Sequence, residues 1–394
     1  MTRKICVFTG TRAEYGLLKP LIDELIAEPE IEVQLLISGM HLSPEFGLTY
    51  KDIDTTGCAK VEKVEMLLSS DSSVGISKAM GLGMISYAEA LERLKPDLLI
   101  GLGDRFELFA VAAAATVLRI PIAHLHGGEA TEGAFDEAFR HSITKMSHLH
   151  FAATETYRKR IIQLGEHPDH VYNVGAIGLD HLKTMRLLSK QELEKEIGFS
   201  INEKTALVTY HPVTLENATA ERQFDELLKA LDQFEDLKIV FTKPNADTDG
   251  RIIIQMIDNY VQQNPGKAIS FVSMGQLKYL SAMAQASCVI GNSSSGIVEA
   301  PSLKVGTVNI GDRQKGRIKA QSVIDCLPES NQIVASIHTC LNSEFCNKIK
   351  KINNPYEISS GRSADRIKSI ILSRTWSDLL KKKFFDIDIG QNDH

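Results

Sequence analysis

The sequence predicts an α/β protein of two domains, each built on a doubly wound parallel sheet. Short apolar segments with strand character alternate with amphipathic helical segments from one end of the chain to the other, which is typical of parallel sheets covered by helices. Several strand segments, such as 98–100 and 207–208, are apolar without interruption, as in strands buried on both faces. The length of 394 residues exceeds one ordinary core and favours two domains of about 150–200 residues.

The first half of the chain contains six predicted strands. They lie at 4–9, 32–38, 97–102, 120–125, 149–153 and 171–175. After Arg12, leucine and isoleucine recur at helical spacing as far as Ile26 and form one apolar stripe. The alanine-rich segment 105–118 is apolar almost throughout, which indicates a helix buried between layers.

The second half repeats this alternation. Its predicted strands lie at 205–210, 237–242, 268–273, 287–291 and 305–310. Between the halves, 190–198 is a charged helical segment and 200–204 reads as a polar linker. The expected parts of the chain are an N-terminal domain at 1–180, a C-terminal domain at 181–364, and closing helices at 365–394 that join the first domain.

Composition and charge exclude several classes of protein. The net charge is −6, and the only basic run, Lys381–Lys383, is short and read as a solvated helix face, so nucleic acid is not expected as a partner. No apolar run reaches the roughly 18 residues of a membrane span, and no signal-like segment follows the start. The six cysteines form no CxxC pair and indicate reduced thiols in a cytoplasmic protein. No ligand spacing predicts a metal site.

Glycine-punctuated loops with polar side chains follow predicted strands in both halves. The side chains concerned are Arg12, Asp104, Arg105, His126 and Glu129 in the first half, and His211, Asn292, Ser293, Ser294 and Ser295 in the second. The carboxyl ends of parallel strands meet at the crevice where such sheets bind ligands. Arginine, histidine, acids and serine together favour an anionic ligand with many hydroxyls, such as a nucleotide sugar.

Two of these loops suggest anion sites. The turn Gly10–Gly16 lacks the G-x-G-x-x-G pattern and the P-loop ending, but Arg12 begins a helix, where anions are favoured; pairing with a nearby acid is the alternative. The turn 291–295 offers hydroxyls and N–H groups to a diphosphate, and Glu299 could accept both hydroxyls of a ribose. A plain capping loop with an exposed glutamate is the alternative. His211 either binds a phosphate oxygen or is structural.

An acidic and imidazole cluster marks the first half. Asp104 and His126 end two predicted strands, Glu129 follows, and Asp136 opens the helix that contains Arg140. General acid–base catalysis needs such groups within hydrogen-bond reach of one substrate. A capping role is the alternative for Asp136.

Taken together, these motifs resemble those of the hydrolysing UDP-N-acetylglucosamine 2-epimerases, and within them the sialic-acid-pathway branch, over nearly the whole chain. The motifs are Gly10–Tyr15, Gly103–Arg105, His126–Glu129, Arg140–Lys145, His211–Pro212, Gly291–Gly296 and Gly311–Arg317. The resemblance implies a GT-B fold of two Rossmann-like domains with the active site in the interdomain cleft. It also implies a homodimer and no metal or nicotinamide cofactor.

The resemblance implies conversion of UDP-N-acetylglucosamine and water into N-acetylmannosamine and UDP, through a 2-acetamidoglucal. It assigns acid–base roles to Asp104 and Asp136, with a third role falling to His126 or Glu129, because many relatives carry a glutamate where this chain has His126. The implied substrate and UDP ligands are Arg12, Arg105, His211, Asn292, Ser293, Ser294, Gly296, Glu299 and Arg313. The alternatives are the same chemistry on UDP-2,4-diacetamido-2,4,6-trideoxyglucose, a GT-B glycosyltransferase, and a non-catalytic nucleotide-sugar-binding protein.

Overall fold

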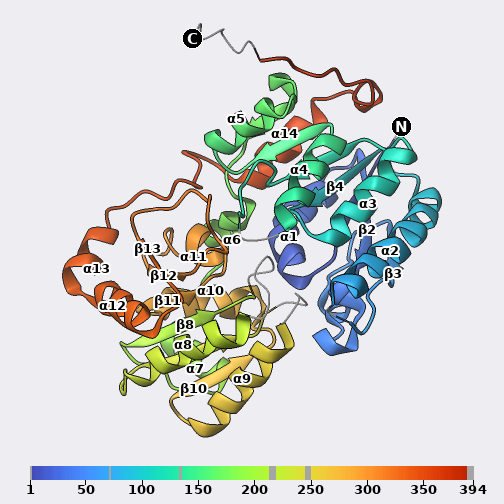
Figure 1. The fold of residues 1–394 in the computed structure, drawn as a ribbon. Coiled ribbons are helices and arrows are strands. Elements are labelled where there is room, and N and C mark those ends of the chain that lie inside the picture. The colour runs from blue at the N-terminus through green and yellow to red at the C-terminus, as the bar shows by residue number, and fades with distance from the viewer. Residues whose placement is uncertain (1, 71, 133–134, 213–218, 245–249, 388–394) are drawn as a thin grey trace, which may run out of the picture.

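The computed structural model describes residues 2–70, 72–132, 135–212, 219–244 and 250–387. Two parallel β-sheets, one of seven and one of six strands, form the centres of two α/β halves (Figure 1). The predicted fold class of two parallel-sheet α/β domains is therefore confirmed. The exact domain boundaries stay a prediction.

The seven-stranded sheet has the order β3-β2-β1-β4-β5-β6-β7. Its strands are β1 (Arg3–Thr9), β2 (Ile31–Ser38), β3 (Lys60–Val64), β4 (Leu98–Leu102), β5 (Ile122–Leu125), β6 (Leu149–Ala152) and β7 (Val171–Asn173). β1 pairs in parallel with both β2 and β4, so the strand order reverses between β1 and β4. Open α/β sheets bind ligands beside such a reversal, at the carboxyl ends of the strands.

The six-stranded sheet has the order β10-β9-β8-β11-β12-β13. Its strands are β8 (Thr205–Thr209), β9 (Lys238–Thr242), β10 (Ala268–Phe271), β11 (Cys288–Gly291), β12 (Gly306–Ile310) and β13 (Val323–Cys326). Its reversal lies between β8 and β11, which pair in parallel. The loops that carry His211 and Ser293 therefore leave adjacent strands.

The uninterrupted apolar strands are explained by a core on each face of the sheet. In β1, Ile5 and Val7 point into one core of the first half, and Cys6 and Phe8 point into the other, because side chains alternate along a strand. All four are buried. β8 divides its residues between two cores of the second half in the same way.

Helices cover both faces of each sheet (Figure 1). They are α1 (Arg12–Ile26), α2 (Ser73–Leu94), α3 (Phe106–Val117), α4 (Asp136–Met146), α5 (Glu155–Gln163), α6 (Asp180–Thr184), α7 (Lys190–Ile197), α8 (Ala220–Asp232), α9 (Gly250–Gln263), α10 (Gly275–Gln285), α11 (Ser295–Val298), α12 (Ser330–Leu341), α13 (Ser343–Ile349) and α14 (Ser363–Leu372). The alanine-rich α3 packs between α2 and α4. Of the helices in the described ranges, none has the length and apolarity needed to cross a lipid bilayer.

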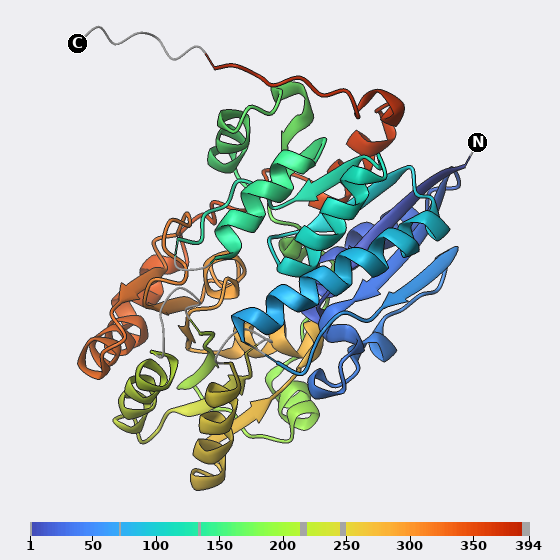
Figure 2. The same ribbon diagram turned by 45° about the vertical axis from the view of Figure 1, so that its right-hand side comes forward.

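The C-terminal segment returns to the first half of the molecule. Helix α14 packs against α1, and Trp376 and Leu379 join a core of the first half. Further on, the chain runs past α5 (Figure 2). The expectation of a solvated helix face at Lys381–Lys383 is wrong, because no helix forms there and the ammonium of Lys382 donates to the Ser147 carbonyl at 2.8 Å and to both Glu166 carboxylate oxygens at 2.9 Å.

Candidate active site

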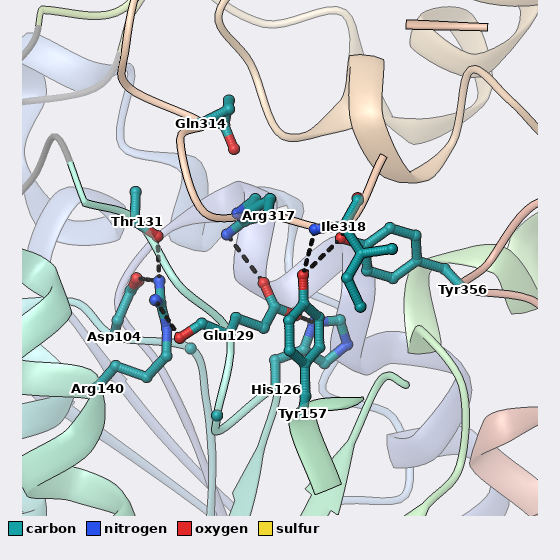
Figure 3. A network of polar contacts seen from close by, with 12 residues as sticks. Asp104, His126, Glu129, Thr131, Arg140, Tyr157, Gln314, Arg317, Ile318 and Tyr356 are labelled. Atoms are coloured by element: carbon teal, nitrogen blue, oxygen red, sulfur yellow. Dashed lines mark hydrogen bonds and ion pairs between the residues drawn. The ribbon is translucent and has the colours of Figure 1, made fainter. Parts of the chain in front are cut away.

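The candidate site lies where loops from the two sheets meet. The loop after β5, residues 126–132, touches the loop after β12, residues 311–318. The amide of Glu132 donates to the Lys315 carbonyl at 3.2 Å, and Glu129 forms an ion pair with Arg317 at 3.0 Å (Figure 3). A carboxylate of the first half and an arginine of the second half are therefore in direct contact at this point.

The half-buried His126 and the buried Glu129 form a pair in this loop. Nδ1 of His126 lies 2.9 Å from Oε1 of Glu129, and Nε2 of His126 accepts from the amide of Ile177 at 3.4 Å. A nitrogen that accepts from an amide carries no proton, so the proton of a neutral His126 lies on Nδ1, facing Glu129. Burial raises the pKa of Glu129, but the charge of Arg317 and the hydrogen bond from His126 outweigh burial and leave that pKa below its ordinary value.

Asp104 is held by Arg140, whose side chain is only 1% exposed. The Arg140 guanidinium donates to the Asp104 carboxylate, to Oγ1 of Thr131 at 2.7 Å and to the Glu129 carbonyl at 3.0 Å (Figure 3). It also donates to the Glu137 carboxylate at 2.8 Å. One buried cation on α4 thus joins the loop after β4 to the loop after β5. Arg140 fixes the Asp104 carboxylate beside the backbone of Glu129.

A second buried side chain fixes the turn before Asp104. The ring of His124 on β5 is fully buried, and burial lowers its pKa to about 3. The neutral ring donates from Nε2 to the Gly103 carbonyl at 2.7 Å, and Nδ1 is 3.2 Å from Oγ1 of Thr144. Gly103 has φ of +86°, a conformation that glycine adopts without strain.

The remaining predicted groups of the first half have different surroundings. Asp136 is the first residue of α4 and is half-buried. The guanidinium of Arg105 donates two hydrogen bonds, of 3.1 and 3.2 Å, to the buried carboxylate of Glu107. Glu107, in the first turn of α3, therefore orients the Arg105 side chain. Roles for Asp136 in catalysis and for Arg105 in substrate binding stay predictions.

Arg12 begins α1, but the end of this helix already holds a carboxylate. Oε2 of Glu14 accepts from the amides of Gly10 and Thr11 at 2.8 and 3.2 Å, and Thr11 caps the amide of Glu14. This is a capping box, which the Thr-x-x-Glu pattern at 11–14 would have indicated. An anion at this position would therefore be bound mainly by the guanidinium of Arg12, because the amides of Gly10, Thr11 and Glu14 already have partners.

In the second half, the side chain of Asn292 braces His211. Its Oδ1 accepts from the His211 amide at 2.7 Å, and its Nδ2 donates to the His211 carbonyl at 2.8 Å. Arg313 and Gln314 donate to the Asn292 carbonyl at 3.3 and 2.8 Å. The Asn292 amide thus orients a neighbouring loop, whereas the sequence predicted it as a ligand of UDP.

Two glycines of the serine turn are required by close packing. Gly291 has φ of +131°, and a Cβ there would lie 1.9 Å from the Thr209 carbonyl oxygen. A Cβ on Gly296 would lie 2.7 Å from a methyl group of Thr307. Between them, Ser293 and Ser294 lead into the short helix α11. The serine turn is thereby pressed against the carboxyl end of β8 and against the beginning of β12.

Glu299 directly follows α11 and is buried, with 7% exposure, so the alternative of an exposed glutamate is wrong. Burial raises its pKa to about 7, and the charges of His126 and Arg317 oppose this. A Cβ on Gly178 would lie 2.8 Å from its Oε1. Glu299 of the second half therefore lies against the 3₁₀ turn Ile177–Leu179, which packs on α1 of the first half.

The structure brings together Asp104, His126, Glu129 and Glu299, four of the predicted groups, around two arginines. Arg140 and Arg317 were not predicted as site residues. Both belong to motifs that carried the resemblance, Arg140–Lys145 and Gly311–Arg317, so the sequence contained a signal for each. Within the described ranges, no cluster of three His, Cys, Asp or Glu residues is placed to hold a metal ion.

A groove of about 460 Å³ also runs between the halves. Its wall includes Leu42, Phe46, Met66, Phe106 and Ile254. At its rim, Arg251 on α9 pairs with Glu45 at 2.9 and 3.1 Å. The groove passes Phe106, the residue after Arg105, so it adjoins the loops described above.

Comparison with known proteins gives a consistent result. A family described as UDP-N-acetylglucosamine 2-epimerase matches residues 23–372. The chain is 43% identical over 343 residues to a GDP/UDP-N,N'-diacetylbacillosamine 2-epimerase (hydrolyzing) of Campylobacter jejuni, covering 87% of this chain and 88% of the relative. It is 40% identical to polysialic acid biosynthesis protein P7 of Escherichia coli, covering 90% of each. A Neisseria meningitidis UDP-GlcNAc 2-epimerase, crystallised with UDP-GlcNAc, shares the fold with a TM-score of 0.76 at 21% identity, covering 94% of this chain and 100% of that one.

Proposed function

Because the chain belongs to the UDP-N-acetylglucosamine 2-epimerase family, we propose that it is a hydrolysing 2-epimerase of a UDP-linked 2-acetamido sugar. Water and the UDP-sugar would give UDP and the free sugar inverted at C2. The observation that carries this proposal is the pair of carboxylate–arginine contacts, Asp104 with Arg140 and Glu129 with Arg317, at the meeting of the two sheets.

The chemistry requires UDP to leave first. The hydrogen on C2 has no adjacent carbonyl group and is not acidic by itself. The bond between C1 and the diphosphate oxygen breaks, its electron pair goes to UDP, and positive charge develops at C1. A carboxylate then takes the C2 proton and the C1–C2 double bond forms. Water adds its hydroxyl at C1, and a proton returns to C2 from the opposite face.

The first half supplies groups suited to these proton transfers. We assign acid–base roles to Asp104 and Asp136, and stabilisation of the charge at C1 to the ionised Glu129 beside His126. The second half supplies groups suited to the leaving group. Its serine turn, with Arg313, would receive the diphosphate, and Glu299 would accept the ribose hydroxyls.

Two sugars are candidates for the substrate. The Campylobacter relative favours UDP-N,N'-diacetylbacillosamine, which is the 2,4-diacetamido-2,4,6-trideoxyglucose alternative. The family description and the polysialic acid relative favour UDP-N-acetylglucosamine, which would yield N-acetylmannosamine. The two differ only at C4 and C6, so the chemistry at C1 and C2 is common to both.

The test is a proton NMR time course in D₂O with each UDP-sugar and no acceptor. Release of UDP with the 2-epimer carrying deuterium at C2 is the expected result, and the faster sugar is the substrate. Release of the unepimerised sugar would indicate hydrolysis by a glycosyltransferase. Tight UDP binding without turnover of either sugar would refute the proposal in favour of a binding protein.

A further inference from the structure

Two tyrosines from distant parts of the chain bind the backbone N–H and C=O of Ile318, the residue after Arg317. Tyr157 belongs to α5, and Tyr356 lies between α13 and α14. The amide of Ile318 donates to Oη of Tyr157 at 3.0 Å, and Oη of Tyr356 donates to the Ile318 carbonyl at 2.9 Å. The two hydroxyl oxygens are 2.9 Å apart (Figure 3).

The protons of this group can be assigned without ambiguity. Each hydroxyl has one proton to donate. Tyr356 gives its proton to the Ile318 carbonyl, so Tyr157 must donate to Tyr356, while accepting from the Ile318 amide. The result is a closed ring of hydrogen bonds, which we call the tyrosine ring, and both tyrosines are 0% exposed. The backbone N–H and C=O of Ile318 both have partners within it.

The segment that carries Tyr356 also reaches other parts of the site. The Tyr356 carbonyl accepts from the amide of Ala176 at 3.1 Å. Ala176 directly precedes Ile177, whose amide bonds His126. Asn354 donates to the Val298 carbonyl at 2.7 Å, directly before Glu299. Residues 354–356 therefore contact the backbone next to Arg317, Glu299 and Ile177.

We propose that Tyr157 and Tyr356 are positioning residues, whose hydroxyl ring fixes Arg317 in its ion pair with Glu129. This inference rests on the proposed function, because the position of Arg317 affects catalysis only if Glu129 takes part in the reaction. The geometry supports this role. Ile318 follows Arg317 in the chain, so a shift of the Ile318 backbone also moves the Arg317 guanidinium. Without the ring, the ion pair loses its fixed geometry while Glu129 stays buried.

The readout is the ionisation of Glu129. The groups that face it are Arg317 from the loop after β12, His126 and His124 from β5 and its loop, Arg140 from α4, Glu299 from α11, and the two tyrosines. Of these, Arg317 and His126 favour the ionised form. Loosening Arg317 should therefore raise the pKa of Glu129 and move the acidic limb of the pH–rate profile upward, by about one pH unit if half of a typical ion-pair shift is lost.

The variants are Tyr157→Phe and Tyr356→Phe, which remove one oxygen each and keep the rings. Tyr87→Phe is the matched control, because Tyr87 is also fully buried and bonds Ser38 at 2.7 Å, in a core of the first half that contains neither Arg317 nor Glu129. All three should lose stability, but only the first two should lower kcat, by about tenfold, and shift the acidic limb. An unchanged pH profile in both would overturn the proposal and leave a structural role alone. If one variant does not fold, the other decides.

Two further measurements separate this inference from the proposed function. In an Arg317→Met background, Tyr157→Phe should have no further effect on the pH profile, and an additive effect would contradict positioning through Arg317. Carbon-13 NMR of labelled glutamate, with the Glu129 signal assigned from Glu129→Gln, follows its ionisation without any substrate. An inactive wild-type protein refutes the proposed function, whereas an unshifted Glu129 titration in both tyrosine variants refutes this inference.

Discussion

The assignment of Glu299 to the ribose predicts a specific pH dependence of nucleoside binding. Its side chain is buried, and burial raises its pKa from 4.5 to about 7. A ribose diol donates two hydrogen bonds, which an ionised carboxylate can accept and a protonated carboxyl group accepts less well. Binding should therefore select the ionised form and release a proton at neutral pH.

The size of the effect follows from that pKa. The ionised fraction of a group with a pKa of about 7 is roughly 0.9 at about pH 8 and roughly 0.1 at about pH 6. Affinity should therefore fall about tenfold between these values, which equals about 1.4 kcal/mol. The same raised pKa implies that Glu299 destabilises the empty fold as pH rises from about 4.5 through about 7, because the unfolded chain ionises first.

Calorimetric titration with uridine is the suitable assay, since uridine carries the diol and has no phosphate that titrates in this range. Wild-type protein should lose affinity toward acid, and Glu299→Gln should bind weakly with a flat profile. Glu14→Gln is the comparison variant, because burial raises the pKa of Glu14 to about 7 as well, but its carboxylate caps α1. This variant should keep the pH dependence of uridine binding. A slope that survives in Glu299→Gln, or a flat wild-type profile, would refute the ribose assignment.

Three other changes test separate parts of the structure. Asp104→Asn should abolish turnover and leave UDP affinity within a few-fold, measured by UDP release and calorimetry; a fully active variant would remove Asp104 from the mechanism. Asn292→Leu breaks two buried bonds to His211 and should cost about 2–4 kcal/mol in urea unfolding; a loss below 1 kcal/mol would argue against the brace. Lys382→Met removes the ammonium that bonds the buried Glu166 and should cost about 2 kcal/mol, whereas Lys381→Met removes a neighbouring charge and should cost nothing measurable; equal effects would contradict the role of the Lys382 ammonium.

The two sheets could be predicted because their central strands are apolar on both faces. The strands that were missed, β3 and β13, lie at the edges of their sheets. β3 reads Lys-Val-Glu-Lys-Val and is mostly exposed, so it lacks the continuous apolar run of a central strand. An edge strand of this kind is determined by pairing with its neighbour more than by its own side chains.

The site was less predictable than the fold, because local patterns do not show which partner a side chain will meet. Asp104 and Glu129 could be found at the ends of strands, but their arginines come from α4 and from a loop of the other half. Asn292 was expected to bind a ligand, and the structure shows its side chain bonded to the backbone of His211, so a ligand role for it stays a prediction. Hydroxyl and amide side chains in a glycine-rich turn serve ligands and backbone equally well, and only the three-dimensional arrangement separates the two uses.

The position of the C-terminal segment has a consequence for biosynthesis. A nascent chain leaves the ribosome from its N-terminus, and domains usually fold in that order. Here the core against α1 includes Ile367, Ile371, Trp376 and Leu379, which are made after the strands of both sheets. The seven-stranded sheet must therefore wait, with part of its apolar surface uncovered, until the six-stranded sheet has been translated. Chains that stop before Ile367 should consequently depend on chaperones more than chains that include this segment.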